Sequence, residues 1–153
     1  MHNKDYIGID PGISGGVAVI DKLDNATCIA CPKTPMLMGE ELFGMIPRDG
    51  TEIIATIEHV HAFPTDGRSS AFKFGRNFGQ WEGILSEMDV PYSLITPYAW
   101  QKHFECPKFD AKKLRKRWLK EKAEELYPHL KITFKVSDAI LIARFGMDKD
   151  LEG

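Results

Sequence analysis

The chain has 153 residues, of which 43% are hydrophobic and 27% charged. These proportions are typical of one folded domain and exclude collagen-like, disordered and disulfide-rich proteins. The net charge of −2 conceals an asymmetry, because residues 102–122 carry nine Lys or Arg and three acids, a balance of +6 that leaves −8 elsewhere. No apolar run is long enough to span a membrane, and residues 1–5 lack a signal-peptide core. We therefore expect a single cytoplasmic domain, residues 1–153, without a membrane partner.

The first part of the chain is expected to form strands. Short apolar runs separated by turn residues predict three strands, at residues 6–10, 17–20 and 26–31. Their connections are too short for parallel crossovers, so these strands should form an antiparallel meander. Two later apolar runs, at residues 53–58 and 90–95, predict a buried central strand and one further strand.

Helices are expected between and after the later strands. Apolar periodicity and capping signals place them at residues 36–46, 69–88, 97 onward, 110–127 and 136–145. Asp110 is the expected N-cap of the fourth helix, and Gly146 is the expected stop after the last. This order of elements predicts an α/β fold, in which a mixed sheet carries helices on its faces.

Three acids occupy comparable positions at the ends of these elements. Asp10 ends the first strand, Glu58 ends the fourth, and Asp138 begins the last helix. If the first and fourth strands are neighbours, the three carboxylates converge and repel one another unless a cation balances them. Mg²⁺ prefers such hard oxygen ligands, and two ions about 4 Å apart can hold and hydrolyse a phosphodiester. Taken singly, each acid is more commonly a turn, rim or helix-dipole residue.

Each acid stands in a longer patterned segment. The segments are Tyr-Ile-Gly-Ile-Asp-Pro-Gly at residues 6–12 with Gly-Gly-Val-Ala-Val-Ile at 15–20, Ile-Glu at 57–58 with Ser-Ala-Phe-Lys-Phe-Gly at 70–75, and Ser-Asp-Ala-Ile-Leu-Ile-Ala at 137–143. In order and spacing they resemble the motifs of the RuvC family of Holliday junction resolvases, which are nucleases of the RNase H-like superfamily. The resemblance extends over about residues 5–146.

The resemblance carries expectations about fold and function. It implies an RNase H-like five-stranded sheet, three antiparallel strands followed by two parallel ones, flanked by helices. It implies a homodimer that cuts four-way DNA junctions with two symmetric, Mg²⁺-dependent nicks, with Mn²⁺ as an alternative ion. Asp10, Glu58 and Asp138 would be the catalytic metal ligands, holding two ions per site. Such an enzyme would act on nucleic acid in the cytoplasm of a bacterial or virus-infected cell.

Two lysines bear on the predicted site. The RuvC family usually has an acid or a His three residues before its last aspartate, and this chain has Lys135 there. A protonated Lys135 cannot bind a metal, so the fourth ligand is missing or supplied elsewhere, and Lys135 could contact the DNA phosphate instead. Lys102 lies where RuvC-like proteins often carry a catalytic lysine, although a solvated surface role is equally compatible with the sequence.

Further cations are predicted to contact DNA phosphates. Six cations and no acid lie between Asp110 and Glu121, which exceeds what solubility requires. From this segment we assign four residues to the DNA interface: Lys112, Lys113, Lys116 and Arg117. Arg68, Lys73 and Arg76, which lie within or beside the second motif, are assigned to the same interface. Phe63, in the loop before them, either wedges into the junction or packs locally under Pro64.

Two small-residue patterns allow more than one interpretation. Gly75, Gly79 and Gly83 form a strip on the helix at 69–88 that could pack on the sheet or, as the resemblance favours, on a partner subunit. Cys28 and Cys31 match C-x-x-C, but they lie in a predicted strand and lack a second pair, so a structural role is favoured over zinc or redox chemistry.

Other functions compete with junction resolution. A different RNase H-like nuclease acting on RNA–DNA hybrids or flap DNA would share the carboxylates without needing a two-fold dimer. A non-catalytic junction-binding module would explain the missing fourth ligand. A phosphotransferase of the sugar-kinase-like fold would need two domains to enclose ATP, which this length disfavours.

Overall fold

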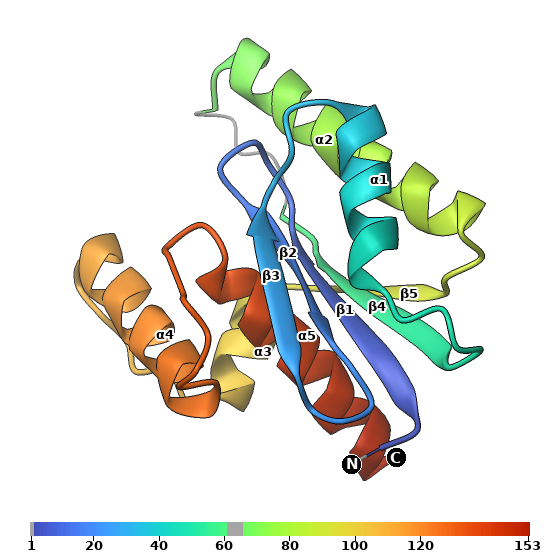
Figure 1. Ribbon diagram of the computed structural model, residues 1–153. Coiled ribbons are helices and arrows are strands. Elements are labelled where there is room, and N and C mark those ends of the chain that lie inside the picture. The colour runs from blue at the N-terminus through green and yellow to red at the C-terminus, as the bar shows by residue number, and fades with distance from the viewer. Residues whose placement is uncertain (1, 61–65) are drawn as a thin grey trace.

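The computed structural model describes residues 2–60 and 66–153 (Figure 1). It contains one five-stranded sheet with the order β3-β2-β1-β4-β5. The strands are β1 (Lys4–Asp10), β2 (Gly16–Ile20), β3 (Ala26–Ala30), β4 (Glu52–Glu58) and β5 (Tyr92–Ile95). Strands β1, β2 and β3 pair antiparallel, while β4 is parallel to β1 and β5 is parallel to β4. The predicted mixed sheet is therefore confirmed, including the adjacency of the first and fourth strands.

Helices cover both faces of the sheet. They are α1 (Pro35–Met45), α2 (Arg68–Glu87), α3 (Pro97–His103), α4 (Lys112–Leu126) and α5 (Ser137–Glu152). Helices α1 and α2 lie on one side, and α5 lies across the other, with α3 and α4 beside it (Figure 1). Alternate residues of β1 supply the two cores, because Ile7 and Ile9 pack with α1 and α2, whereas Tyr6 packs with α3, α4 and α5.

Glycine allows α5 to lie directly on β1. A Cβ atom at Gly8 would collide with the backbone of Ala139 and Ala143, two fully buried residues of α5. The absence of a side chain on the strand and the small side chains on the helix therefore permit a close approach. This approach brings Asp138, at the first turn of α5, to the end of β1.

Two predicted helix boundaries are wrong. Asp110 is not the N-cap of α4, because Ala111 occupies that position and the helix begins one residue later. Gly146 does not stop α5, which continues to Glu152. A Cβ at Gly146 would lie 2.5 Å from the hydroxyl of Thr56, so this glycine serves close packing on β4 inside the helix.

The cysteine pattern has a structural role in this fold. Cys28 packs against the core on the α5 side, and Cys31 packs against the core on the α1 side. The two thiols therefore lie on opposite sides of the sheet and cannot share a metal ion. All three cysteines are free.

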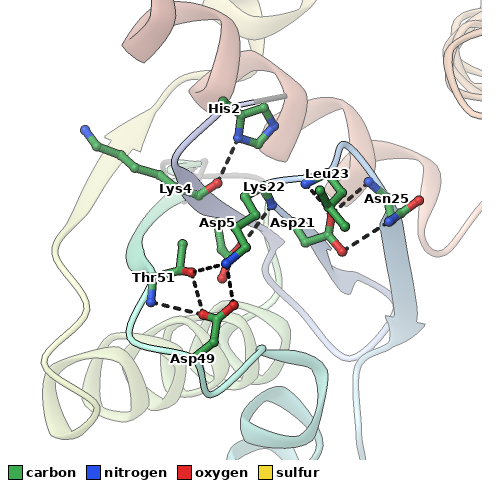
Figure 2. A network of polar contacts seen from close by, with 9 residues as sticks. All are labelled: His2, Lys4, Asp5, Asp21, Lys22, Leu23, Asn25, Asp49 and Thr51. Carbon is green, nitrogen blue, oxygen red and sulfur yellow. Dashed lines mark hydrogen bonds and ion pairs between the residues drawn. The ribbon is translucent and has the colours of Figure 1, made fainter.

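A polar network closes the sheet at the start of β1, the end remote from Asp10 (Figure 2). The carboxylate of Asp5, which has no exposed surface, accepts a 3.0 Å hydrogen bond from the backbone N–H of Lys22. The Lys22 ammonium forms a 2.6 Å ion pair with Asp49, and Thr51 donates its backbone N–H to Asp49 at 3.1 Å. These contacts connect β1 to the turn before β3 and to the loop before β4.

In the described part of the chain, none of the helices combines the length and apolar character that a membrane span requires.

Candidate active site

A cavity of about 700 Å³ opens where β1 and β4 end. The turn after β1 forms one wall, and α2, α3, α4 and the start of α5 supply the others. All three predicted metal ligands line this cavity: Asp10, Glu58 and Asp138. The parallel pairing of β1 with β4 explains this, because residues at the carboxyl ends of adjacent parallel strands meet at one edge of a sheet.

The sequence after Asp10 forms a tight turn. Gly12 has φ +111°, a conformation that side-chain-bearing residues rarely adopt, and the backbone N–H of Gly15 donates to its carbonyl at 3.0 Å. A Cβ at Gly15 would collide with the carbonyl oxygen of Asp10. The Pro-Gly-x-x-Gly-Gly pattern therefore reverses the chain within a few residues and leaves Asp10 at the cavity.

Glu58 is held from outside the sheet by a tryptophan. Its side chain is only 7% exposed, and the buried indole N–H of Trp100 in α3 donates to its Oε2 at 2.7 Å. Glu58 and Asp10 line the same cavity, and the charge of Glu58 helps to raise the pKa of Asp10. The sequence interpretation missed Trp100, although a buried indole N–H generally requires an acceptor.

The three carboxyl groups bind protons more tightly than isolated carboxylates do. Burial raises the pKa of Glu58 to about 7 and that of Asp138 to about 6. Burial, followed by the negative charges of Asp138 and Glu58, raises the pKa of Asp10 well above its usual value. This pattern is typical of acids held together without enough positive charge.

Helix α4 places cations on the same cavity. Lys112, Arg115 and Lys116 line it, and their charges lower the pKa of Asp138 against the effect of burial. The spacing of these three residues explains why all of them reach the cavity, since residues three and four apart share one face of a helix. Arg115 was not among the residues assigned to the DNA interface, although helical spacing from Lys112 would have identified it.

No protein-family model matches the sequence, and no curated protein matches it. Solved structures do match. RuvC of Thermus thermophilus in complex with a Holliday junction substrate has a TM-score of 0.70 at 17% identity, covering 98% of this chain and 96% of that chain. The chain has the RuvC fold. A second structure of Thermus thermophilus RuvC has a TM-score of 0.60 at 16% identity and covers 95% of this chain and 96% of the other. At such identities the likeness establishes a shared RNase H-like fold.

In this RuvC fold, some of the other predicted site residues line the cavity and others do not. Lys73 on α2 lines it, whereas Arg76 lines a smaller neighbouring pocket beside Asn77. The described lining residues do not include Arg68, Lys102, Lys113, Arg117 or Lys135. Phe63 lies outside the described residues.

The two lysines singled out beside the motifs both point to solvent. Lys102 is exposed, and its ammonium lies 5.7 Å from the ring centroid of Tyr98. Lys135 is exposed on the turn before α5, which begins only at Ser137. Lys135 is also absent from the described residues that line the cavity, so it does not occupy a ligand position beside Asp138.

The donor set of the cavity fits a hard divalent cation. Among the described residues, no three His, Cys, Asp or Glu side chains stand close enough together to enclose an ion as they are. The described lining residues nevertheless offer carboxylates and hydroxyls with no imidazole or thiol. Asp10, Glu58 and Asp138 share the cavity and repel one another there, and Mg²⁺ would offset that repulsion.

Proposed function

We propose that this protein is a structure-specific endonuclease that resolves four-way DNA junctions by paired Mg²⁺-dependent hydrolysis of phosphodiesters. The observation that carries the proposal is the cavity in which Asp10, Glu58 and Asp138 face three cations of α4. The match to a RuvC structure in complex with a Holliday junction substrate adds a structural precedent for the DNA.

Each group at the cavity has a proposed role in this reaction. Asp10, Glu58 and Asp138 would hold Mg²⁺, which when bound supplies a polarised water and neutralises charge on the phosphate. Lys112, Arg115 and Lys116 bind the scissile phosphate, whose negative charge their side chains complement. Water adds to the phosphorus atom, one P–O bond to the leaving strand breaks, and the leaving oxygen takes up a proton, so that one new end carries a phosphate and the other a hydroxyl.

Paired cleavage requires two sites, and we propose that α2 forms the dimer interface. Gly75, Gly79 and Gly83 are exposed, and a Cβ at any of them would meet no described atom within 4 Å. The strip therefore does not pack on the sheet of its own chain. A mostly apolar groove of about 500 Å³ between α1 and α2, which Phe43 and Ile84 help to line, continues this surface and fits the α2 helix of a second copy.

The test offers the protein three substrates: a synthetic four-way junction, a flap and an RNA–DNA hybrid. Each is incubated with Mg²⁺ and, separately, with EDTA. Symmetric nicks in the junction alone, only with Mg²⁺, are expected. Cleavage of the hybrid or flap would instead assign another RNase H-like activity, and junction binding without any product would assign a binding module. Sedimentation should give a dimer, which Gly79→Arg should convert to a monomer.

A further inference from the structure

Asn77 is a buried polar residue of α2 that the proposed reaction does not use. It is 5% exposed, and both ends of its amide have partners outside its own helix. Its Oδ1 accepts a 2.7 Å hydrogen bond from the backbone N–H of Gly12, and its Nδ2 donates to the thiol of Cys31 at 3.3 Å. One side chain thus connects α2, the turn after β1 and the residue that follows β3.

The Gly12 N–H belongs to the turn that carries Asp10. Pro11 before it is buried, and the positive φ of Gly12 turns the chain away from the strand. Loss of the Asn77 oxygen would leave the Gly12 N–H without this acceptor and would favour other conformations of the turn. Because Gly12 lies two residues after Asp10, such a change would also move the Asp10 carboxyl relative to Glu58.

Asn77 suits this place because its amide is neutral. The charge of Asp10 reaches the neighbouring Cys31 thiol and contributes to raising its pKa, after burial. A charged side chain at position 77 would therefore add to the repulsion in the acid cluster or would pair with one of its members. An amide fixes the turn through a hydrogen bond and leaves the carboxylates available for a cation.

We propose that Asn77 is a positioning residue that holds the Asp10–Gly12 turn so that the Asp10 carboxyl faces Glu58. Its effect on catalysis rests on the proposed nuclease function, but its effect on the turn does not. The oxygen of Asn77 orders the Gly12 amide, and the ordered turn presents a preformed pair of carboxylates to Mg²⁺.

The first test measures the turn without metal or DNA. Hydrogen exchange of the Gly12 amide, followed by NMR, should be faster in Asn77→Ala than in the unaltered protein. Asn77→Asp keeps an oxygen acceptor at the same distance along the side chain and should restore much of the protection. Equal exchange in the unaltered protein and Asn77→Ala would overturn the proposal, as would equal exchange in the Ala and Asp variants.

The second test measures function. Asn77→Ala should weaken Mg²⁺ binding, measured by calorimetry, and lower kcat, each by about 10–100-fold. Junction affinity in EDTA should stay unchanged, because Asn77 is buried away from DNA. Asn25→Ala, which removes an amide at the opposite end of the sheet, is the matched control and should leave Mg²⁺ binding and kcat unaltered.

The outcomes separate this proposal from the proposed function. If the unaltered protein cleaves junctions and Asn77→Ala cleaves them with the same kcat and Mg²⁺ affinity, Asn77 has no positioning role although the nuclease assignment stands. If the unaltered protein cleaves nothing, the nuclease assignment fails, and Gly12 exchange with Mg²⁺ affinity still decides the role of Asn77.

Discussion

The buried acids at the two ends of β1 have different surroundings. Asp5, near its start, accepts a hydrogen bond from the Lys22 backbone, and the Lys22 ammonium pairs with nearby Asp49 (Figure 2). Asp10, at its end, shares a cavity with Glu58, and none of the described ion pairs involves either residue or Asp138. At the Asp5 end a backbone N–H binds one oxygen of the buried acid, and an ion pair beside it closes the fold. At the other end the acids have no ion pair among the described residues, although cations of α4 line the same cavity, and their pKa values stay raised.

The largest expected effect comes from neutralising one acid at each end. Asp10→Asn should lower junction cleavage by more than about a hundredfold, because an amide is a poorer Mg²⁺ ligand than a carboxylate. It should also raise the melting temperature of the metal-free protein at pH 8, because it removes a buried like charge. Single-turnover cleavage and thermal melts measure the two effects.

Asp5→Asn is the matched control for that change. Its amide oxygen can still accept the hydrogen bond from Lys22, so cleavage should stay at the unaltered level. If Asp10→Asn retained cleavage, or if both variants lost cleavage equally, the contrast between the two ends would be wrong.

The second prediction divides the cations of α4 by the face they occupy. Lys112 and Lys116 line the cavity, whereas Lys113 and Arg117 do not. Replacing the first pair by Ala should lower the cleavage rate by about a hundredfold, since a phosphate at the carboxylates would lose its nearest cations. Replacing the second pair should mainly reduce the salt dependence of binding, by about one in slope for each phosphate that the variant no longer binds. Equal rate losses from both pairs would contradict this division.

The third prediction concerns the tryptophan that holds Glu58. Trp100→Phe keeps most of the apolar side chain but removes the N–H that donates to Glu58, and it should lower kcat about tenfold. Trp81 is the matched control, because it is equally buried and its indole N–H has no partner among the described residues. Trp81→Phe should therefore alter stability without altering kcat, and a similar kcat loss in both variants would exclude a specific role for the Trp100 hydrogen bond.

The sequence predicted the sheet more fully than it predicted the site. Strands and the three acids could be recognised because apolar runs, turn glycines and motif spacing are local patterns. The exposure of Lys102 could not be recognised from such patterns. It follows from the burial of Trp100, which places the opposite side of α3 against the core. Likewise, the sequence pattern predicts a helix end at Gly146, because the contact that explains this glycine is with Thr56, ninety positions earlier in the chain.

The fourth prediction is a pH dependence of stability. The pKa values of Glu58 and Asp138, about 7 and about 6 in the fold, lie above their unfolded values. The folded metal-free protein therefore binds protons more tightly than the unfolded chain, and its free energy of unfolding should fall as pH rises from 5 to 8, by roughly 4 kcal/mol. Denaturant titrations measure this fall.

Mg²⁺ provides the control for that measurement. At pH 8 it should restore stability by binding the folded state, and it should do little at pH 5, where protons occupy the carboxylates. Asp49 and Asp150 have lowered pKa values, so their opposite contributions to stability change only below about pH 4. A stability that rises from pH 5 to pH 8 without metal would contradict the raised pKa values of the acids at this end of β1.

The smallest expected effect is at the compensated end. Lys22 and Asp49 have side chains that are 41% and 40% exposed, and an ion pair so open to water contributes little to stability. The hydrogen bond to Asp5 comes from the backbone N–H of Lys22, which every substitution except proline retains. Lys22→Met should therefore shift the melting temperature by no more than about 2 °C and leave cleavage unchanged. A much larger drop would mean that the Lys22 ammonium itself stabilises the buried Asp5 carboxylate. The start of β1 would then depend on a cation, and not on the backbone hydrogen bond alone.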